Sequence, residues 1–271
     1  MAPPSPTQLA NIEFHRLLVA HYEKQPYFQA PNRERVRALL LNLAQSTPAR
    51  RLLDVGCGTG LILDLAHDLF QKLDGIDITP EMIERVTPRE NVRTQLASAE
   101  SIPFPNETFD LVTAYGVLHH IDNLGRVFRE VRRVLKGGGV FYADESPSQH
   151  YSDTLFALSP HLPMTDIARQ ARDRVMSDAA EYQKRFGLPV EVVQRAMVQN
   201  YAFHALRQDK LEHLLKSAGF EKVQITFRRF LGEEQCQQAG GEELVNTVQN
   251  FLVSLLPVTR GLFKYFVLVA R

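Results

Sequence analysis

The segment from Arg51 to Gly60, which reads R-L-L-D-V-G-C-G-T-G, constrains the fold of this chain more than any other. An apolar run leads into three glycines at alternating positions, Gly56, Gly58 and Gly60, and an apolar stretch at helical spacing follows. This pattern predicts a buried strand, a glycine turn and a helix, which is how parallel α/β sheets bring backbone close to a nucleotide. Glycine suits the turn because positive φ angles and close ligand approach both exclude a side chain.

The residues around these glycines narrow the kind of ligand. The glycines follow an acid as D-x-G-x-G-x-G, with Asp54 just before the turn, and no Lys-Ser/Thr pair follows. A phosphate-cradling P-loop is therefore disfavoured. A carboxylate at the mouth of the turn would repel a pyrophosphate, whereas it suits a ligand that carries an ammonium or sulfonium charge. The same acid weighs against a nicotinamide dehydrogenase, which shares this type of sheet.

Composition sets broad limits on the partners of the chain. The 271 residues contain 31 Lys+Arg and 31 Asp+Glu, so the formal net charge is zero and a large electrostatic footprint for nucleic acid is not expected. The two cysteines, Cys57 and Cys236, form no disulfide framework, which indicates a reducing compartment. No signal peptide or apolar run long enough to span a bilayer is evident. We expect a cytoplasmic protein.

Strand and helix patterns alternate from Arg50 to Leu135, which predicts a parallel sheet with helices on both faces. Further strands are expected at 72–78, 92–96, 109–115, 140–143, 223–227 and 262–269, the last antiparallel to the sixth. We expect a Pro-rich disordered start (1–8), early helices at 9–22 and 32–44, cap helices at 166–186 and 190–198, and later helices at 210–219 and 242–256. This organisation gives an N-terminal helical segment (1–45), a core (46–147 and 206–271) and an inserted helical cap (148–205).

The second expected strand ends in a candidate ligand-binding acid. Asp77 lies 17 positions beyond Gly60, close to the interval at which Rossmann-like sheets place a carboxylate on ribose hydroxyls. A carboxylate suits this task because it can accept hydrogen bonds from two neighbouring hydroxyls. Asp74, in the same strand, is the competing candidate.

The glycine stretch and the later segment L-H-H-I-D (118–122) resemble class I S-adenosylmethionine-dependent methyltransferases, most closely small-molecule enzymes of the ubiquinone/menaquinone and sterol type. The resemblance is strong over about residues 50–145 and weak over 205–271. It implies a Rossmann-like, seven-stranded, mostly parallel sheet with N-terminal helices and an inserted cap. It also implies S-adenosyl-L-methionine as methyl donor, with S-adenosyl-L-homocysteine as the product.

The resemblance also implies a set of cofactor-binding residues. Ile78 and Met82 would flank the adenine, and Tyr115 would lie against the cofactor. The loop that follows the third strand departs from the family pattern. The same loop in the family often carries Asp where this chain has Ser98, and this difference bears on the affinity for the cofactor. The expected cofactor-binding residues are Asp54, Gly56, Cys57, Gly58, Gly60, Asp77, Ile78, Met82, Ser98, Ala99, Glu100 and Tyr115.

Candidates for proton transfer and acceptor binding lie at the ends of the fourth and fifth strands. His119, His120 and Glu145 are candidate general bases, needed only where the nucleophile must lose a proton. The histidines could instead pack at the start of a helix, and Glu145 could instead cap a loop. The tandem histidines with Asp122 also suggest a metal site, but metal ligands that act together usually lie on one face with a third partner, and no metal site is expected.

The acceptor pocket is expected to be shaped by the early helices. Tyr22 and Tyr27 are candidate pocket residues together with His119 and Glu145, although both tyrosines could simply pack the helices. The predicted reaction is direct in-line transfer of a methyl group to an oxygen, nitrogen or carbon nucleophile of a small molecule, with no nucleic-acid partner. A non-catalytic cofactor-binding or regulatory protein and, less so, a nucleic-acid methyltransferase are the alternatives; an N-P-P-Y-like stretch after the fourth strand is lacking. The sequence leaves the acceptor, the methylated atom and the oligomeric state open.

Overall fold

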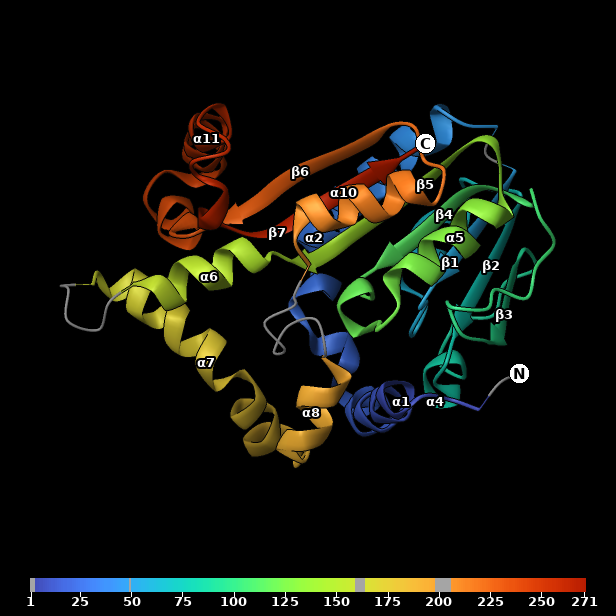
Figure 1. Cartoon of the computed structure of the whole chain (residues 1–271), viewed down its shortest axis with the longest axis horizontal. Helices are drawn as coiled ribbons and strands as arrows, with labels where there is room; N and C mark the ends of the chain where they lie inside the picture. Colours follow the sequence, from blue (N-terminus) through green and yellow to red (C-terminus); the bar gives the residue numbers. More distant parts are fainter. Residues whose placement is uncertain (1–2, 49, 159–163, 198–205) are drawn as a thin grey trace.

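A seven-stranded sheet forms the centre of the molecule (Figure 1), in a computed structural model that describes residues 3–48, 50–158, 164–197 and 206–271. The strand order is β3-β2-β1-β4-β5-β7-β6. β7 pairs antiparallel with β5 and β6, while the remaining pairs are parallel, so the expected mostly parallel, Rossmann-like sheet is confirmed. The strands are β1 (Arg51–Val55), β2 (Lys72–Asp77), β3 (Val92–Leu96), β4 (Phe109–Tyr115), β5 (Leu135–Pro147), β6 (Val223–Phe230) and β7 (Phe263–Ala270).

Helices cover both faces of the sheet. The α-helices are α1 (Pro6–Leu18), α2 (Ala30–Gln45), α3 (Leu61–Ala66), α4 (Pro80–Ile83), α5 (Leu124–Val134), α6 (Gln149–Ala157), α7 (Asp166–Phe186), α8 (Val190–Ala196), α10 (Gln208–Ser217) and α11 (Glu233–Ser254). Short 3-10 helices are η1 (Val19–Lys24), η2 (Pro26–Phe28), η3 (Leu118–His120) and η4 (Arg260–Leu262). α5 and α10 pack on one face, and α2 and α3 pack on the other.

The central strands are buried on both faces, which explains their continuous apolar sequences. Neighbouring residues of one strand point to opposite faces of a sheet. Leu52 and Leu111 accordingly pack in the cluster beneath α2 and α3, whereas Leu53 and Val112 pack in the cluster beneath α5 and α10. The two clusters hold the strand ends rigidly, and the functional site is built at those ends.

A third apolar cluster joins the N-terminal helix to the cap. Ala10, Phe14 and Leu18 of α1 pack against residues of the cap, namely Ala179, Leu188, Val193, Ala196 and Met197. Figure 1 shows α1 and α8 side by side, below the carboxyl ends of the central strands. We call α1, α8 and the adjoining end of α7 the lid. Because its apolar side chains pack on one another, the lid is a unit assembled from two distant segments of the chain.

Several element boundaries differ from the sequence-based expectations. α1 begins at Pro6 within the stretch expected to be disordered, because Ser5 and Gln8 form a capping box. β5 begins at Leu135, five residues before the strand expected at 140–143, since Leu135 already pairs with Phe109 of β4. α11 starts nine residues early, at Glu233, with non-helical angles at Gly241. The expected cap helix at 190–198 ends at Ala196, and position 198 lies outside the described residues.

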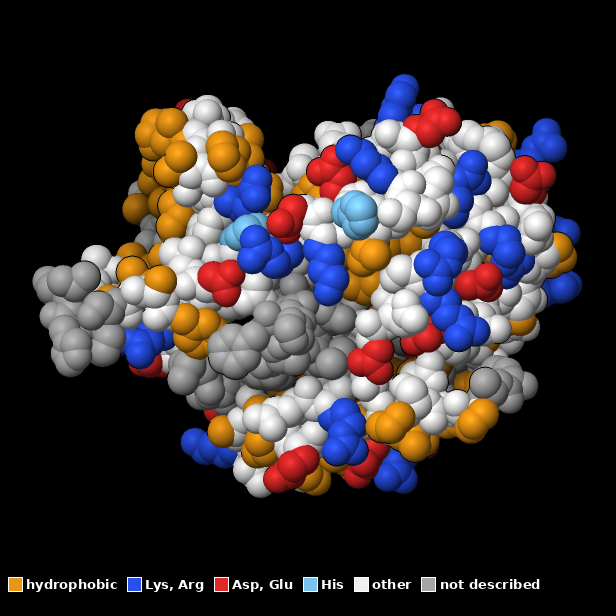
Figure 2. All heavy atoms as spheres, viewed as in Figure 1, with side chains coloured by type: hydrophobic (Ala, Val, Ile, Leu, Met, Phe, Trp, Pro, Cys, Tyr) orange, Lys and Arg blue, Asp and Glu red, His pale blue; other side chains and the backbone are white. Residues whose placement is uncertain are grey.

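The surface carries interspersed acidic and basic side chains, while apolar side chains gather on α11 (Figure 2). Among the described residues, none of the helices has both the length and the apolar composition of a bilayer-crossing segment. The cytoplasmic location and the proposed domain boundaries stay predictions.

Candidate functional site

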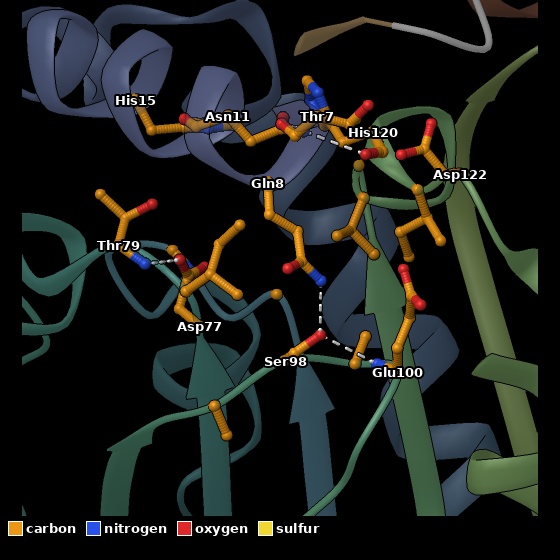
Figure 3. A pocket seen from close by; sticks show the side chains of 18 of the residues that line it. Thr7, Gln8, Asn11, His15, Asp77, Thr79, Ser98, Glu100, His120 and Asp122 are labelled. Atoms are coloured by element: carbon orange, nitrogen blue, oxygen red, sulfur yellow. Dashed lines mark hydrogen bonds between the residues drawn. The ribbon is translucent and has the colours of Figure 1, made fainter. Parts of the chain in front are cut away.

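A pocket with a cavity volume of about 80 Å³ lies at the carboxyl ends of β1, β2 and β4 and the loop after β3. Figure 3 shows its two sides: side chains of α1 lie above, and residues from the strand ends lie below. The floor is lined by Gly56, Gly58, Asp77, Ile78, Thr79, Ala97, Ser98, Ala99 and Glu100, and the side by Gly116, Val117, His120, Ile121 and Asp122. The roof is lined by Thr7, Gln8, Asn11, His15 and Tyr22. This is where open parallel sheets bind ligands.

The glycine turn is closely fitted to its surroundings. Gly56 and Gly58 have φ angles of 68° and 52°, which other residues rarely adopt. A Cβ atom on Gly56 would lie 2.4 Å from Val117 Cγ2, and one on Gly58 would lie 3.4 Å from the Tyr22 ring. Both glycines are therefore required by the backbone angle, and Gly56 also by the space beside Val117.

Asp77 is fixed in position by the backbone on either side of the pocket floor. Its Oδ2 accepts a hydrogen bond from Gly58 N (2.9 Å), and its Oδ1 accepts one from Thr79 N (2.8 Å). Each carboxylate oxygen keeps a second lone pair for a ligand. The competing candidate, Asp74, is buried and pairs with Arg51 Nε at 2.7 Å, and it does not line the pocket.

Ser98 connects the floor to the roof. Its Oγ accepts a hydrogen bond from Gln8 Nε2 of α1 at 3.0 Å and one from Glu100 N at 3.2 Å (Figure 3). Glu100 is partly exposed, and burial raises the pKa of its carboxyl. The lid thus contacts the loop after β3 directly, through an uncharged hydrogen bond.

Asn11 makes a second polar contact between lid and floor. Its Nδ2 donates to Thr7 O and to His120 O, both at 3.0 Å, which fixes the orientation of the amide because carbonyls can only accept. Its Oδ1 is buried and has no partner among the described residues. A buried acceptor of this kind beside a pocket suits a ligand that brings a hydrogen-bond donor.

Three histidines cluster at one end of the pocket. The ring centroids of His15 and His120 lie 4.9 Å apart, and those of His119 and His120 lie 4.1 Å apart. Burial lowers the pKa of all three, to about 3 for His119, so the rings are neutral at pH 7. Within the described ranges, no group of three or more His, Cys, Asp or Glu side chains is arranged to hold a metal ion.

Asp54 lies behind the pocket and not in it. The side chain is 2 % exposed, and its Oδ1 accepts a hydrogen bond of 2.7 Å from Thr113 Oγ1. Burial raises the pKa of this carboxyl to about 7. Four other residues predicted to bind the cofactor also do not line the pocket: Cys57, Gly60, Met82 and Tyr115.

The candidates at the end of β5 form a separate buried network. Glu145 Oε1 pairs with Arg228 Nη2 at 2.7 Å, and Tyr115 Oη donates to the same oxygen at 3.5 Å. Asp144, fully buried, pairs with Arg35 at 2.8 Å and accepts from Tyr142 Oη at 2.7 Å. Glu145 also has a φ of 51°, a strained value for a residue with a side chain. The contact with Arg228 occupies Oε1 of Glu145 and suits this side chain to a positioning role.

The structure therefore brings only part of the candidate set together. Of the candidate bases, His120 lines the pocket, while His119 and Glu145 do not. Of the two tyrosines, Tyr22 lines the pocket and Tyr27 packs behind it, with 5.8 Å between the centroids of the two rings. The α1 residues Thr7, Gln8, Asn11 and His15 also line the pocket and were not among the predicted residues. Gln8, Asn11 and His15 recur at intervals of three and four, beside the apolar stripe of α1, and such an uncharged polar stripe is the signal that could have indicated them.

Comparisons with known proteins identify the family. The model of a methyltransferase domain matches residues 53–143. An uncharacterized methyltransferase, YcgJ of Bacillus subtilis, is 37% identical over 120 residues, which are 40% of this chain and 47% of that protein. The demethylmenaquinone methyltransferase of Symbiobacterium thermophilum is 31% identical over 192 residues, which are 64% of this chain and 69% of that protein. The chain thus spans about half the length of the first relative and two thirds of the second.

Solved structures agree on the fold. A SAM-dependent methyltransferase from Archaeoglobus fulgidus superimposes with a TM-score of 0.55 at 20% identity, covering 93% of this chain and 98% of that one. This likeness concerns the fold, while the identity to the Symbiobacterium enzyme over most of its length establishes descent. Together with the glycine turn and Asp77 at the pocket floor, these matches show that the chain belongs to the family of class I S-adenosylmethionine-dependent methyltransferases.

Proposed function

We propose that this protein transfers the methyl group of S-adenosylmethionine directly, in line, to an oxygen, nitrogen or carbon nucleophile of a small molecule. The observation that carries the proposal is the pocket itself, which joins the glycine turn and Asp77 to a roof of α1 side chains. Side chains of the lid cover one side of the pocket, which favours a small acceptor over a nucleic acid. The neutral net charge of the chain supports the same choice.

The residues at the pocket fit the cofactor. Gly56 and Gly58 present backbone without side chains, and the Asp77 carboxylate keeps lone pairs for two ribose hydroxyls. Thr79 Oγ1 lines the pocket and is a second buried oxygen without a partner among the described residues. The sulfonium group supplies an electrophilic methyl when the cofactor is bound. Asp54 would stabilise positive charge behind the turn once its carboxyl is ionised.

The remaining task of the chain is to align the acceptor and to exclude water. Ile78 and the Ser98–Glu100 loop would hold the adenine, and Tyr22 would lie over the turn at Gly58. Cys57, Gly60, Met82 and Tyr115 would act by shaping this floor from behind. Alignment of two reactants in an enclosed site can lower a barrier by several kcal/mol without an acid or base, up to about 7–11 kcal/mol.

Isothermal titration calorimetry with S-adenosylmethionine, S-adenosylhomocysteine and, as the control, NAD tests cofactor use. We expect micromolar binding of the first two and none of NAD. Transfer of a tritiated methyl group to a panel of small phenols, enols, amines and thiols then tests turnover. Binding of NAD alone would contradict the proposal.

A non-catalytic cofactor-binding role is the second candidate. One observation favours it: the Gln8–Ser98 hydrogen bond uses the side chain that stands where related loops often carry Asp. That role predicts cofactor binding with no methyl transfer to any acceptor in the panel.

A further inference from the structure

Two imidazoles reach the pocket from opposite sides of the lid–core boundary. His15 comes from α1 in the roof, and His120 comes from η3 after β4. Their rings meet edge to face at 71°, with centroids 4.9 Å apart. Such close approach of two charged rings would be repulsive, so the arrangement suits a pair that carries at most one proton.

Backbone carbonyls fix the tautomer of each ring. His15 Nδ1 lies 2.9 Å from Asn11 O, and His120 Nδ1 lies 2.8 Å from Ala196 O. A carbonyl can only accept a hydrogen bond, so each Nδ1 carries the proton and donates it. In a neutral ring the lone pair then belongs to Nε2. No partner for either Nε2 is found within the described ranges, so both nitrogens are available as proton acceptors.

We propose that His15 and His120 together take up the proton that the substrate loses when it is methylated. The reacting group of the substrate is therefore an oxygen or carbon acid, such as a phenol or an enol. This inference rests on the function proposed above and extends it from cofactor use to the class of substrate. Asn11 acts as the positioning residue. Its backbone carbonyl accepts a hydrogen bond from His15 Nδ1, and its Nδ2 donates one to the backbone carbonyl of His120. The unpartnered, buried Oδ1 of Asn11 would accept a hydrogen bond from a second donor group of the acceptor molecule, because the proton of the reacting hydroxyl goes to Nε2.

The proton and electron balance of the step is complete within the pocket. An acceptor oxygen forms its bond to the methyl carbon while the carbon–sulfur bond breaks and its electron pair returns to sulfur. The hydroxyl proton passes to Nε2 of one imidazole, which becomes an imidazolium and later releases the proton to solvent. One positive charge is therefore present before and after the step, first on sulfur and then on the imidazole pair, so the enclosed site never holds two.

Burial and the neighbouring groups act on the protonation of the pair in different directions. Burial lowers the pKa of both rings, which keeps them neutral until the proton arrives. The Asp77 carboxylate raises the pKa of His15 in part, while His119 and His15 lower that of His120. The titratable groups that face the pair from the surrounding elements are Asp77, Glu100, His119 and Asp122 in the core, and Tyr22 and Tyr182 beside the lid.

Nitrogen-15 NMR of the histidine rings tests the inference without requiring turnover. The full chain, labelled at histidine, is measured alone, with S-adenosylmethionine and with S-adenosylhomocysteine, and His15→Asn and His120→Asn assign the signals. We expect both rings as the Nδ1–H tautomer at neutral pH. We also expect the titration midpoint of the pair to lie about one unit or more higher with S-adenosylhomocysteine, because a sulfonium in the same pocket repels the imidazolium.

Each outcome separates the two proposals. Calorimetry with the same samples establishes whether the ligands bind. If neither binds, the proposed function fails, and this inference fails with it. If both bind but the midpoints coincide, or if either ring is the Nε2–H tautomer, the inference is wrong and the proposed function stands. His213, exposed on α10 and outside the pocket, is the internal reference, and its ring signals should be the same in both complexes.

Discussion

Gln8 on α1 donates a 3.0 Å hydrogen bond from Nε2 to the Oγ of Ser98, so the lid and the loop after β3 are joined at the cofactor pocket. Ser98 is the side chain expected to contact the adenine. In the proposed complex, a bound cofactor and Gln8 would therefore compete for the same oxygen. The hydrogen bond from Gln8 to Ser98 and the proposed contact of Ser98 with the cofactor would therefore exclude each other.

Gln8→Ala should bind S-adenosylmethionine more tightly than the wild type, by about 2- to 10-fold, because a net hydrogen bond contributes about 0.5–1.5 kcal/mol. Calorimetry measures the change. Leu9→Ala is the matched control on the same turn of α1, since Leu9 is 54 % exposed and does not line the pocket. Weaker binding by Gln8→Ala would instead show that Gln8 contacts the cofactor.

Asp77→Asn should weaken cofactor binding by about 10- to 100-fold, because one charge-assisted acceptor for the ribose hydroxyls is lost. Asp74→Asn is the control: it removes the ion pair with Arg51 but lies outside the pocket. We expect its dissociation constant to stay within about twofold of the wild type, since it makes no ligand contact. Equal losses in the two variants would contradict the placement of the ribose site.

Gly56→Ala should destabilise the fold by about 2–4 kcal/mol, from a left-handed backbone angle and from overpacking against Val117. Urea unfolding measures the loss. Gly137→Ala, where a Cβ would meet no atom within 4 Å, should change stability by less than about 0.5 kcal/mol. Val117→Ala in the Gly56→Ala background should recover part of the loss, and no recovery would show that the backbone angle alone is responsible.

Asp54 should make the fold less stable as pH rises. Burial raises the pKa of this carboxyl to about 7 in the folded state, so between about pH 4 and pH 7 the folded state holds a proton that the unfolded chain has released. Stability from this group is therefore present below about pH 4 and is lost as pH rises through 7. The full effect is on the order of 4 kcal/mol.

Unfolding free energies of the wild type and Asp54→Asn between pH 4 and 8 test this dependence. The difference should favour the variant increasingly toward pH 8 and should vanish near pH 4, while the contributions of the histidines cancel. Asparagine retains an acceptor for Thr113 Oγ1, so the hydrogen bond is preserved. A difference that does not vary with pH would show that Asp54 is not shifted.

Phe14→Ala should loosen α1 and α8 together. Phe14 is 2 % exposed within the lid cluster, and its ring centroid lies 5.2 Å from that of Tyr182. We expect faster amide hydrogen exchange in both helices and unchanged exchange in β1 and β4, because the lid cluster is separate from the two core clusters. Leu17→Ala, at an exposed position of α1, is the control. Faster exchange in α1 alone would show that the lid is not one unit.

The sheet and the pocket floor could be predicted because their signals are local. A strand, its glycine turn and its terminal acid lie within a few residues of one another, so Gly56, Gly58 and Asp77 were identified directly. Of the two acids in β2, Asp77 lines the pocket. Its oxygens accept hydrogen bonds from the N–H groups of Gly58 and Thr79.

The roof could not be predicted because it depends on contacts between distant segments. His15, Asn11 and Gln8 reach the pocket only because Phe14 and Leu18 pack on α8, some 175 residues later in the chain. His119 and His120 were both candidate bases, with His119 also a candidate pocket residue, whereas the residue that lines the described pocket is His120. η3 is a single short turn, so adjacent residues point in different directions, and only His120 faces the ligand side.

The packing of α1 on α8 also orders the assembly of the protein during synthesis. The strands that carry the pocket floor, β1 to β4, end at Tyr115, whereas α8 ends at Ala196. A ribosome therefore releases the whole floor before it releases the surface that α1 needs. Through that interval the apolar stripe of α1 has no cluster to join, so we expect its side chains to stay exposed to water until α8 has emerged.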